Sequence, residues 1–281
     1  MRKILLSIGL FVMSFLFSFT INFILFETGY VAAKDDTLKD FGGDSSYVFF
    51  NDSQVEEYIR SQFSGKADLT ISRYGSDVKL NTKNFSQSYL NSYYKQLTGI
   101  DVDGSCSIVA IMSVIEYYDR VKNQIDIGTP EDAFVVIMKI AIENKWTDSH
   151  KKDGGTSDTK RDNIMTASFK YYGSKNEGNN DYFDLYDKIK SEVGSNRPSV
   201  FSIIGHSMVA AGYRRYKVQY TDTSGALWWK KTVTKTEYVD FVIVNDGWSN
   251  IRQYSYFPVD KISTNIIYRW DFNITKVIEK K

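Results

Sequence analysis

The segment DGSCSIVAIMSVIEYYD, residues 103–119, decides the fold, because the turn residue Gly104 is followed at once by an apolar helix pattern. Four apolar residues of this segment recur at a spacing that places them on one helical face: Ile108, Val109, Met112 and Ile115. We therefore expect a buried helix from about residue 105 to residue 118. Its first turn carries Cys106, the only cysteine of the 281-residue chain.

A lone cysteine at this position has two interpretations. It is either a small buried hydrophobic residue, as free cysteines often are, or a nucleophile. The free N–H groups and the positive dipole end of a helix N-terminus favour the thiolate, which is the nucleophilic form. The choice depends on whether the rest of the sequence supplies a partner for the thiol.

Residues 1–33 have the organisation of a secretory signal peptide. Two basic residues, Arg2 and Lys3, precede an uncharged apolar stretch over residues 4–26, and a motif of small residues ends at Ala33. We expect cleavage after Ala33 and a secreted, extracellular protein. The stretch 4–26 also reaches the roughly 20 residues that cross a bilayer, so an uncleaved membrane anchor is the alternative.

The charge balance argues against a nucleic-acid-binding protein. The chain has 35 basic and 34 acidic residues, and removal of residues 1–33 leaves 33 of each. A neutral chain lacks the basic excess that displaces counterions from nucleic acid. One cysteine and two histidines, His150 and His206, form neither a disulfide framework nor a zinc-ligand cluster, so we expect no metal and no cofactor.

The chain after the signal has two parts. Residues 34–85 are polar and contain one helix signal, a capping box over 53–56 with a stop at Gly65. This part is a propeptide, a small lobe or a spacer, and the sequence leaves the three open. Apolar residues become denser from Ser86 onward, so we expect one folded domain over residues 86–281.

Helical patterns precede strand patterns in this domain. Beyond the helix at 105–118, helices are expected at 129–141, 158–172 and 181–193. After Pro198, segments rich in β-branched and aromatic residues predict strands at 199–204, 207–213, 216–220, 227–234, 238–245, 253–257 and 266–272. Helices followed by antiparallel strands are typical of an α+β fold.

A histidine that could serve the thiol lies in IIGHSMVAAGY, residues 203–213. His206 follows a glycine at the start of an apolar strand. A cysteine nucleophile needs an imidazole within hydrogen-bond reach, which holds the thiolate as an ion pair and later protonates the leaving group. We predict that His206 has this role, against the alternative of a core histidine. His150 lies in a polar loop and is the poorer candidate.

A third element lies in FVIVNDGWSN, residues 241–250, where an apolar strand ends. Asn245 can orient the imidazole by accepting its N–H, and Trp248 can shield the pair. Asp246 is the alternative orienting residue. Because side chains alternate along a strand, only one of the two can face His206. The alternative is a plain turn at this corner.

These three motifs, Gly-Ser-Cys, Gly-His and Asn-Asp-Gly-Trp, resemble those of papain-like cysteine peptidases. The resemblance is closest to the bacterial secreted branch with the bacteriocin-processing peptidase-like domain, and it spans residues 86–272. It implies a papain-like fold, with a helical half carrying Cys106 and an antiparallel β half carrying His206 and Asn245. It also implies a thiol protease that hydrolyses peptide bonds in a protein or peptide substrate.

The sequence departs from this family at two positions. The family has a glutamine shortly before the cysteine, whose amide helps bind the oxyanion, but here the nearest one upstream is Gln96, ten residues away. Ser107 stands where many members of the branch have glycine. Two alternatives therefore stay open: a cell-wall amidase with the same Cys–His chemistry, and a catalytically inactive papain-like binding or scaffold protein.

Overall fold

The computed structural model describes residues 51–151, 154–203, 205–224, 231–248, 253–260 and 272–280. The predicted signal peptide, its cleavage after Ala33 and the alternative membrane anchor at 4–26 lie outside these residues. Within the described ranges, no helix has the length and apolar character needed to cross a membrane.

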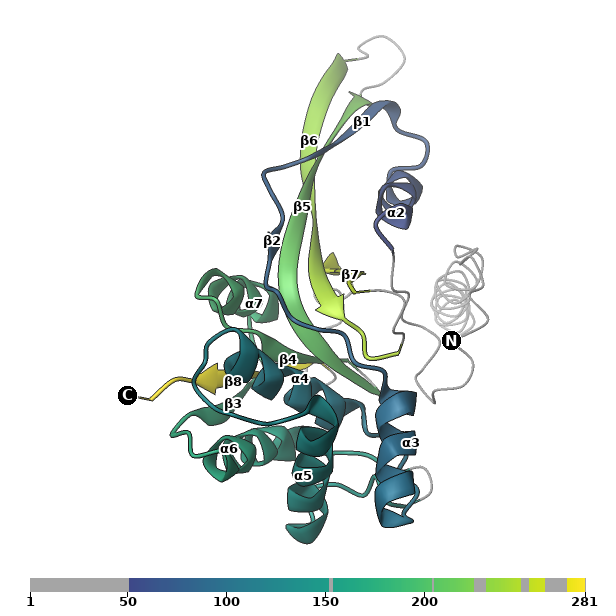
Figure 1. Cartoon of the computed structure of the whole chain (residues 1–281). Coiled ribbons are helices and arrows are strands. Elements are labelled where there is room, and N and C mark those ends of the chain that lie inside the picture. The colour runs from purple at the N-terminus through teal and green to yellow at the C-terminus, as the bar shows by residue number, and fades with distance from the viewer. Residues whose placement is uncertain are drawn as a thin grey trace, which may run out of the picture. The chain divides into compact units, whose positions relative to one another are not determined.

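The described part of the chain combines helices with one antiparallel sheet (Figure 1). The helices are α2 (Gln54–Gln62), α3 (Gln87–Thr98), α4 (Cys106–Arg120), α5 (Pro130–Glu143), the 3-10 turn η2 (Asp158–Lys160), α6 (Arg161–Tyr171) and α7 (Leu185–Gly194). The strands are β1 (Ala67–Arg73), β2 (Val78–Lys79), β3 (Glu177–Asp181), β4 (Ser199–Ile203), β5 (His206–Ser224), β6 (Lys231–Asn245), β7 (Ser255–Pro258) and β8 (Asn273–Ile278). The predicted α+β class is confirmed.

The sheet is built around a long hairpin of β5 and β6. Its strand order is β3-β8-β4-β5-β6-β7, and β1 and β2 also pair with β5. The hairpin register runs from Val209 opposite Asn245 to Ser224 opposite Lys231, with one irregularity between Ala210 and Gly212. This irregularity is next to the site described below, as β-bulges often are.

The main core surrounds helix α4. All residues from 107 to 118 of this helix are buried, because α5, α6 and the strands β4 and β5 lie around it. Two predicted helix starts are reproduced: α4 begins at Cys106, and the Thr129 hydroxyl caps α5 by accepting from the N–H of Asp132 at 3.1 Å. The core thus holds the N-terminus of α4 in a fixed position against the sheet.

A second core lies along residues 216–220 of β5 and extends along β6 to Ile243, on the face opposite to that of Val242 and Val244. Helix α2 packs there against strand residues that alternate into the core. The buried members of this core are Val55, Tyr58, Ile59, Tyr216, Val218, Tyr220, Phe241, Ile243 and Tyr256. Residues 51–80 therefore contribute a helix and two strands to the folded structure, although they belong to the polar region predicted as a propeptide, lobe or spacer.

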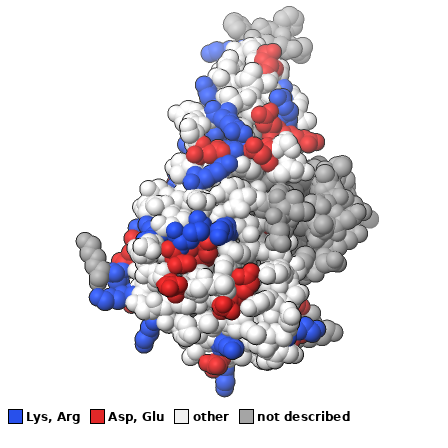
Figure 2. Space-filling view, viewed as in Figure 1, with Lys and Arg blue, Asp and Glu red and all other residues white. Residues whose placement is uncertain are grey.

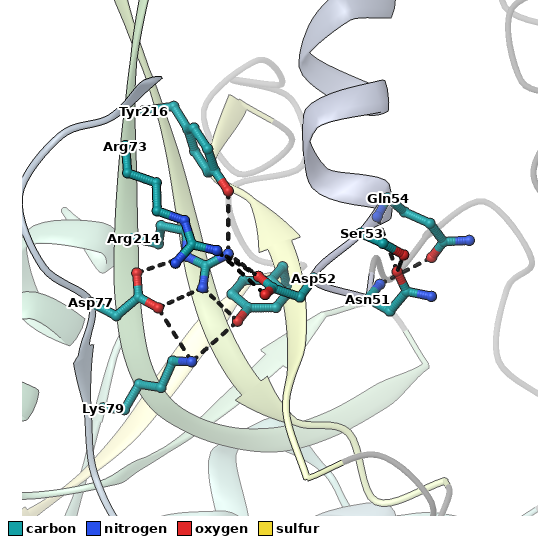
Figure 3. Close-up of polar contacts among 10 residues, drawn as sticks. Asn51, Asp52, Ser53, Gln54, Arg73, Asp77, Lys79, Arg214 and Tyr216 are labelled. Atoms are coloured by element: carbon teal, nitrogen blue, oxygen red, sulfur yellow. Dashed lines mark hydrogen bonds and ion pairs between the residues drawn. The ribbon is translucent and has the colours of Figure 1, made fainter. Parts of the chain in front are cut away.

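The buried guanidinium of Arg214 joins this N-terminal segment to the hairpin (Figure 3). Its Nε and Nη2 donate to the two carboxylate oxygens of Asp77 at 2.7 and 2.5 Å, and Nη1 contacts Asp52. Lys79 adds an ion pair to Asp77 at 3.2 Å. The sequence predicted separate strands at 207–213 and 216–220, but β5 runs through residues 214 and 215, because Arg214 is buried with these partners.

Other differences from the predicted elements have local causes. Helix α2 is capped by Asn51 and Gln54, which exchange two hydrogen bonds of 3.0 Å, whereas the predicted cap Ser53 makes no capping bond (Figure 3). The helix predicted at 181–193 begins at Leu185, because Asp181 ends strand β3. The strand predicted at 266–272 lies almost wholly outside the described residues, and β8 follows it.

Candidate active site

The only cysteine is the first residue of helix α4, and it is partly exposed. The turn before it needs glycine: Gly104 has a φ of +56°, and a Cβ there would lie 1.9 Å from the carbonyl oxygen of Gly154. The N–H of Asp103 donates to the carbonyl of Ser149 at 2.7 Å. The loop around residue 150 thus packs directly on the turn that presents Cys106.

His206 is the first residue of β5 and is buried. Its Nε2 lies 2.6 Å from the main-chain carbonyl oxygen of Asp246, and its ring stacks on Trp248 with centroids 4.1 Å apart and planes at 25°. A carbonyl oxygen only accepts, so Nε2 carries the proton in this contact. Nδ1 is then the ring nitrogen that remains to take a proton.

The structure brings Cys106 and His206 together. Burial raises the pKa of the Cys106 thiol, but the hydrogen bond and charge of His206 act in the opposite direction, together with the N–H of Ser207 and the charge of Arg161. The balance lowers the pKa of Cys106 from 9.0 to about 7. A large part of the thiol is therefore ionised near neutral pH, which is the condition for nucleophilic attack.

The acceptor that orients His206 differs from the expected side chain. The Asn245 amide accepts from the Thr82 hydroxyl and donates to the carbonyl of Gln253. The Asp246 carboxylate accepts from Asn84 at 3.2 Å, from the N–H of Trp248 at 3.1 Å and from Ser255 at 2.6 Å. Both side chains fix the turn at the end of β6, so that the main-chain carbonyl of Asp246 meets the imidazole.

Gln96 does not lie at the site, because it is on the exposed face of α3. The first residue of the same helix, Gln87, is only 5% exposed, and its N–H donates to the carbonyl of Gly247 at 2.8 Å. One turn further along α3, Asn91 accepts from the hydroxyl of Ser105 at 2.5 Å. This face of α3 therefore contacts both the turn that holds His206 and the residue before Cys106.

A buried polar network supports the pair from behind. The hydroxyls of Ser107 and Ser207, the residues that follow Cys106 and His206, lie 2.8 Å apart, and Ser207 also meets Ser202 at 2.9 Å. Arg161 donates from Nε to Ser107 at 3.1 Å. The guanidinium is in turn held by Asp158 and by Asn273. Ser107 thus fixes helix α4 against β5 and does not contact solvent.

The sequence predicted Cys106 and His206 as a pair, and the structure brings these two residues together, but the residues that support them were missed. Gln87 belongs to a helix that no apolar pattern predicted, and nothing in the sequence around Arg161 predicted its burial. His150, the other histidine, lies in an exposed loop. Within the described ranges, no group of three or more histidine, cysteine or acidic side chains is arranged to bind a metal ion.

No family model matches the chain, and no curated protein and no solved structure is significantly similar to it. The residues of the site therefore carry the functional argument.

Proposed function

We propose that the protein is a secreted cysteine peptidase that hydrolyses peptide bonds with a papain-like thiolate mechanism. One observation carries the proposal: the cysteine at the N-terminus of α4 is hydrogen-bonded to an imidazole whose other nitrogen is held at 2.6 Å by a carbonyl. The order of Cys106 and His206, and the helices α3–α7 that precede the antiparallel strands β4–β8, support a papain-like fold.

In the proposed reaction, His206 takes the thiol proton at Nδ1, and the Cys106 thiolate attacks the carbonyl carbon of the substrate. The imidazolium then protonates the leaving amine, and a thioester to Cys106 remains. Water attacks the thioester with His206 as general base, which releases the acid and restores the thiol. The Asp246 carbonyl and the Trp248 ring keep the imidazole in the required orientation and tautomer.

We further propose that Gln87, and not Gln96, helps bind the oxyanion together with the N–H of Cys106. Gln87 is buried beside Gly247, on the face of α3 that also reaches Ser105 through Asn91. The N–H groups in the first turn of α4 have no partner within the helix and are available to a developing negative charge.

The test is the alkylation rate of Cys106 by iodoacetamide as a function of pH. We expect the wild type to react with an apparent pKa of about 7. In His206→Ala the apparent pKa should rise above 9.0, because burial of the thiol then acts with less opposition. His150→Ala removes the other histidine and should match the wild type. Identical profiles for wild type and His206→Ala would refute the pairing.

Substrate assays separate the peptidase from its alternatives. Casein and cell-wall material should be compared in parallel, with Cys106→Ala as the blank for each. Cleavage of casein supports the peptidase, whereas cleavage of the wall material alone supports an amidase with the same chemistry. A reactive thiol whose removal leaves every cellular phenotype intact would favour the binding or scaffold alternative.

A further inference from the structure

Residues 231–239 of strand β6 have one edge that no other strand covers among the described residues. Its inner edge pairs with β5 along the whole strand. Its outer edge pairs with β7 only over residues 241–244, and the N–H of Val259 adds one hydrogen bond to the carbonyl of Asp240. Figure 1 shows β7 beside only one end of β6. Residues 231–238 are all exposed.

This edge has the properties of a pairing surface. An uncovered strand presents a row of N–H and C=O groups that can pair with another chain, and proteins usually protect such edges with short strands, proline, bulges or charged side chains such as lysine. This edge carries Lys231 and Lys235, and the pairing described below places Lys235 opposite a glutamate. Residues 231–239, KTVTKTEYV, contain neither proline nor glycine and are rich in residues that favour strands. The irregularity of the hairpin lies far away, at residues 210–212.

The sequence of this edge is complementary to itself in the antiparallel direction. Pairing centred on Thr236 places Lys235 opposite Glu237 of the partner subunit. The same register places Val233 opposite Val239 of the partner subunit, and Thr234 opposite Tyr238 of the partner subunit. Each pair occurs twice, as a two-fold symmetric interface requires. Opposite charges, β-branched pairs and threonine–aromatic pairs are all favourable across antiparallel strands.

The side chains concerned are available for these contacts. Val233 is 40% exposed and Tyr238 is 48% exposed, so both have apolar surface left to bury. Lys235 contacts Asp222 at 2.6 Å, and Glu237 accepts from the hydroxyl of Tyr220, so both charges already have a partner on β5 and the proposed cross-strand pair would add to these contacts. Figure 2 shows both signs of charge on this part of the molecule, so no single-sign field opposes a second copy.

We infer that the protein forms a symmetric homodimer in which β6 pairs with β6 of a second copy, centred on Thr236. Because pairing centred on a residue keeps equivalent faces on the same side, the two α2 helices then cover the same face of one continuous sheet. The inference does not depend on the proposed peptidase activity, since residues 231–239 lie at the opposite end of β6 from His206 and Asp246.

The register is tested by a cysteine at the centre of the proposed pair, in a Cys106→Ala background. Residues opposite each other in an antiparallel pair have Cα atoms about 4.5–5.5 Å apart, which suits a disulfide. Thr236→Cys should therefore give a covalent dimer on mild oxidation. Thr234→Cys is the matched control: its two copies would lie four residues apart along the strands, roughly 14 Å, and should not link.

The charges are tested by sedimentation equilibrium of the exported chain. Lys235→Glu alone, or Glu237→Lys alone, places like charges opposite each other twice and should weaken the dimer about tenfold. A mixture of the two variants restores both opposite-charge pairs and should give heterodimers. A monomeric wild type, equal linking of Thr236→Cys and Thr234→Cys, or a mixture that stays as dissociated as each single variant would overturn the inference.

Discussion

The two ends of the β5–β6 hairpin differ in burial: the end near His206 is enclosed, whereas the far end is largely exposed on β6. At the site end, residues 206–212 of β5 and 241–245 of β6 are all buried, with α4 and β4 packed on them. At the far end, β5 alternates between buried and intermediate residues, while residues 231–238 of β6 are exposed throughout. The site end is fixed by packing in the main core, and the rest of the hairpin is fixed by α2, β1 and the Arg214 ion pairs.

This difference assigns separate tasks to the two ends. The enclosed end fixes His206 and the Asp246 carbonyl, because neither strand can move without disturbing the main core. The far end packs on a smaller core, and residues 231–238 of β6 are exposed, so we expect a change there to leave the imidazole in place. Substitutions of the site residues should therefore lower the rate of hydrolysis and leave the free energy of unfolding nearly unchanged. Substitutions at the far end should lower the free energy of unfolding and leave the rate unchanged.

The largest effect is expected from Cys106→Ser. A serine hydroxyl is not ionised by His206 near neutral pH, so hydrolysis should fall at least about a thousandfold. The thermal midpoint should stay near that of the wild type, because the two side chains have similar size and Cys106 is partly exposed. Peptide hydrolysis and thermal unfolding measured on the same preparation check both parts. A loss of stability as large as the loss of rate would break the proposed separation.

The reverse behaviour is expected from Arg214→Met. The carboxylate of Asp77, which is largely buried, then loses its ion pair with the Arg214 guanidinium. This loss should lower the free energy of unfolding by about 3 kcal/mol. Arg73→Met, which removes only an exposed ion pair to Asp52, should cost less than about 1 kcal/mol. Chemical denaturation measures both, and Cys106 alkylation below the transition should be unchanged in each.

The same cluster gives the far end a pH dependence. Burial raises the pKa of Asp77, but the hydrogen bonds and charge of Arg214 outweigh it and leave that pKa below its ordinary value of 3.8. The unfolded chain therefore binds the proton first, so this stabilisation is complete above about pH 4 and is lost as pH falls through the lowered pKa. Arg214→Met should lack this acid-dependent component.

A smaller effect on the rate of hydrolysis should distinguish Gln87 from Gln96. Removal of one oxyanion donor typically costs about 100-fold or more in kcat, so Gln87→Ala should lose about this much. Gln96→Ala, on the exposed face of the same helix, should keep the wild-type rate. Steady-state kinetics on one peptide substrate decide the assignment. Equal rates for the two variants would remove Gln87 from the proposed mechanism.

The smallest effect concerns the start of α2. Asn51→Ala removes the side chain that accepts from the N–H of Gln54, and it should cost about 1 kcal/mol. Ser53→Ala tests the cap that the sequence suggested and should cost less, because the Ser53 hydroxyl makes no capping bond. Denaturation midpoints measure both changes. If Ser53→Ala were the more damaging, the cap at the far end would be misassigned.

The sequence predicted the parts of the fold in which local pattern and tertiary packing agree. Helices α4 and α5 have apolar periodicity together with a turn glycine or a threonine cap, and both begin at the expected residues. Strand β3, with the sequence EGNND, has no strand propensity of its own. It forms because β8 supplies five consecutive partners, which no local pattern could reveal.

The residues of the candidate site also divide into those that local sequence predicted and those that depend on contacts between distant parts of the chain. Cys106 and His206 are rare residues at the ends of strong elements, so their sequence context was enough to predict that they lie together. The acceptor for His206 was misjudged because a main-chain carbonyl leaves no trace in a sequence. Arg161 was missed because its burial depends on Asp158 and Asn273, and Asn273 is far away in the chain.

The main-chain acceptor also determines what a mutational survey of this protein can detect. Every amino acid at position 246 supplies a carbonyl, so truncation of that side chain does not delete the atom that contacts Nε2. Activity should instead fall when a residue that fixes this turn is substituted. One such residue is Asn84, which accepts from the N–H of Gly247 at 2.9 Å. In an alanine scan, the role of the Asp246 carbonyl would therefore show only as partial losses of activity at several neighbouring residues, and no single substitution would identify it.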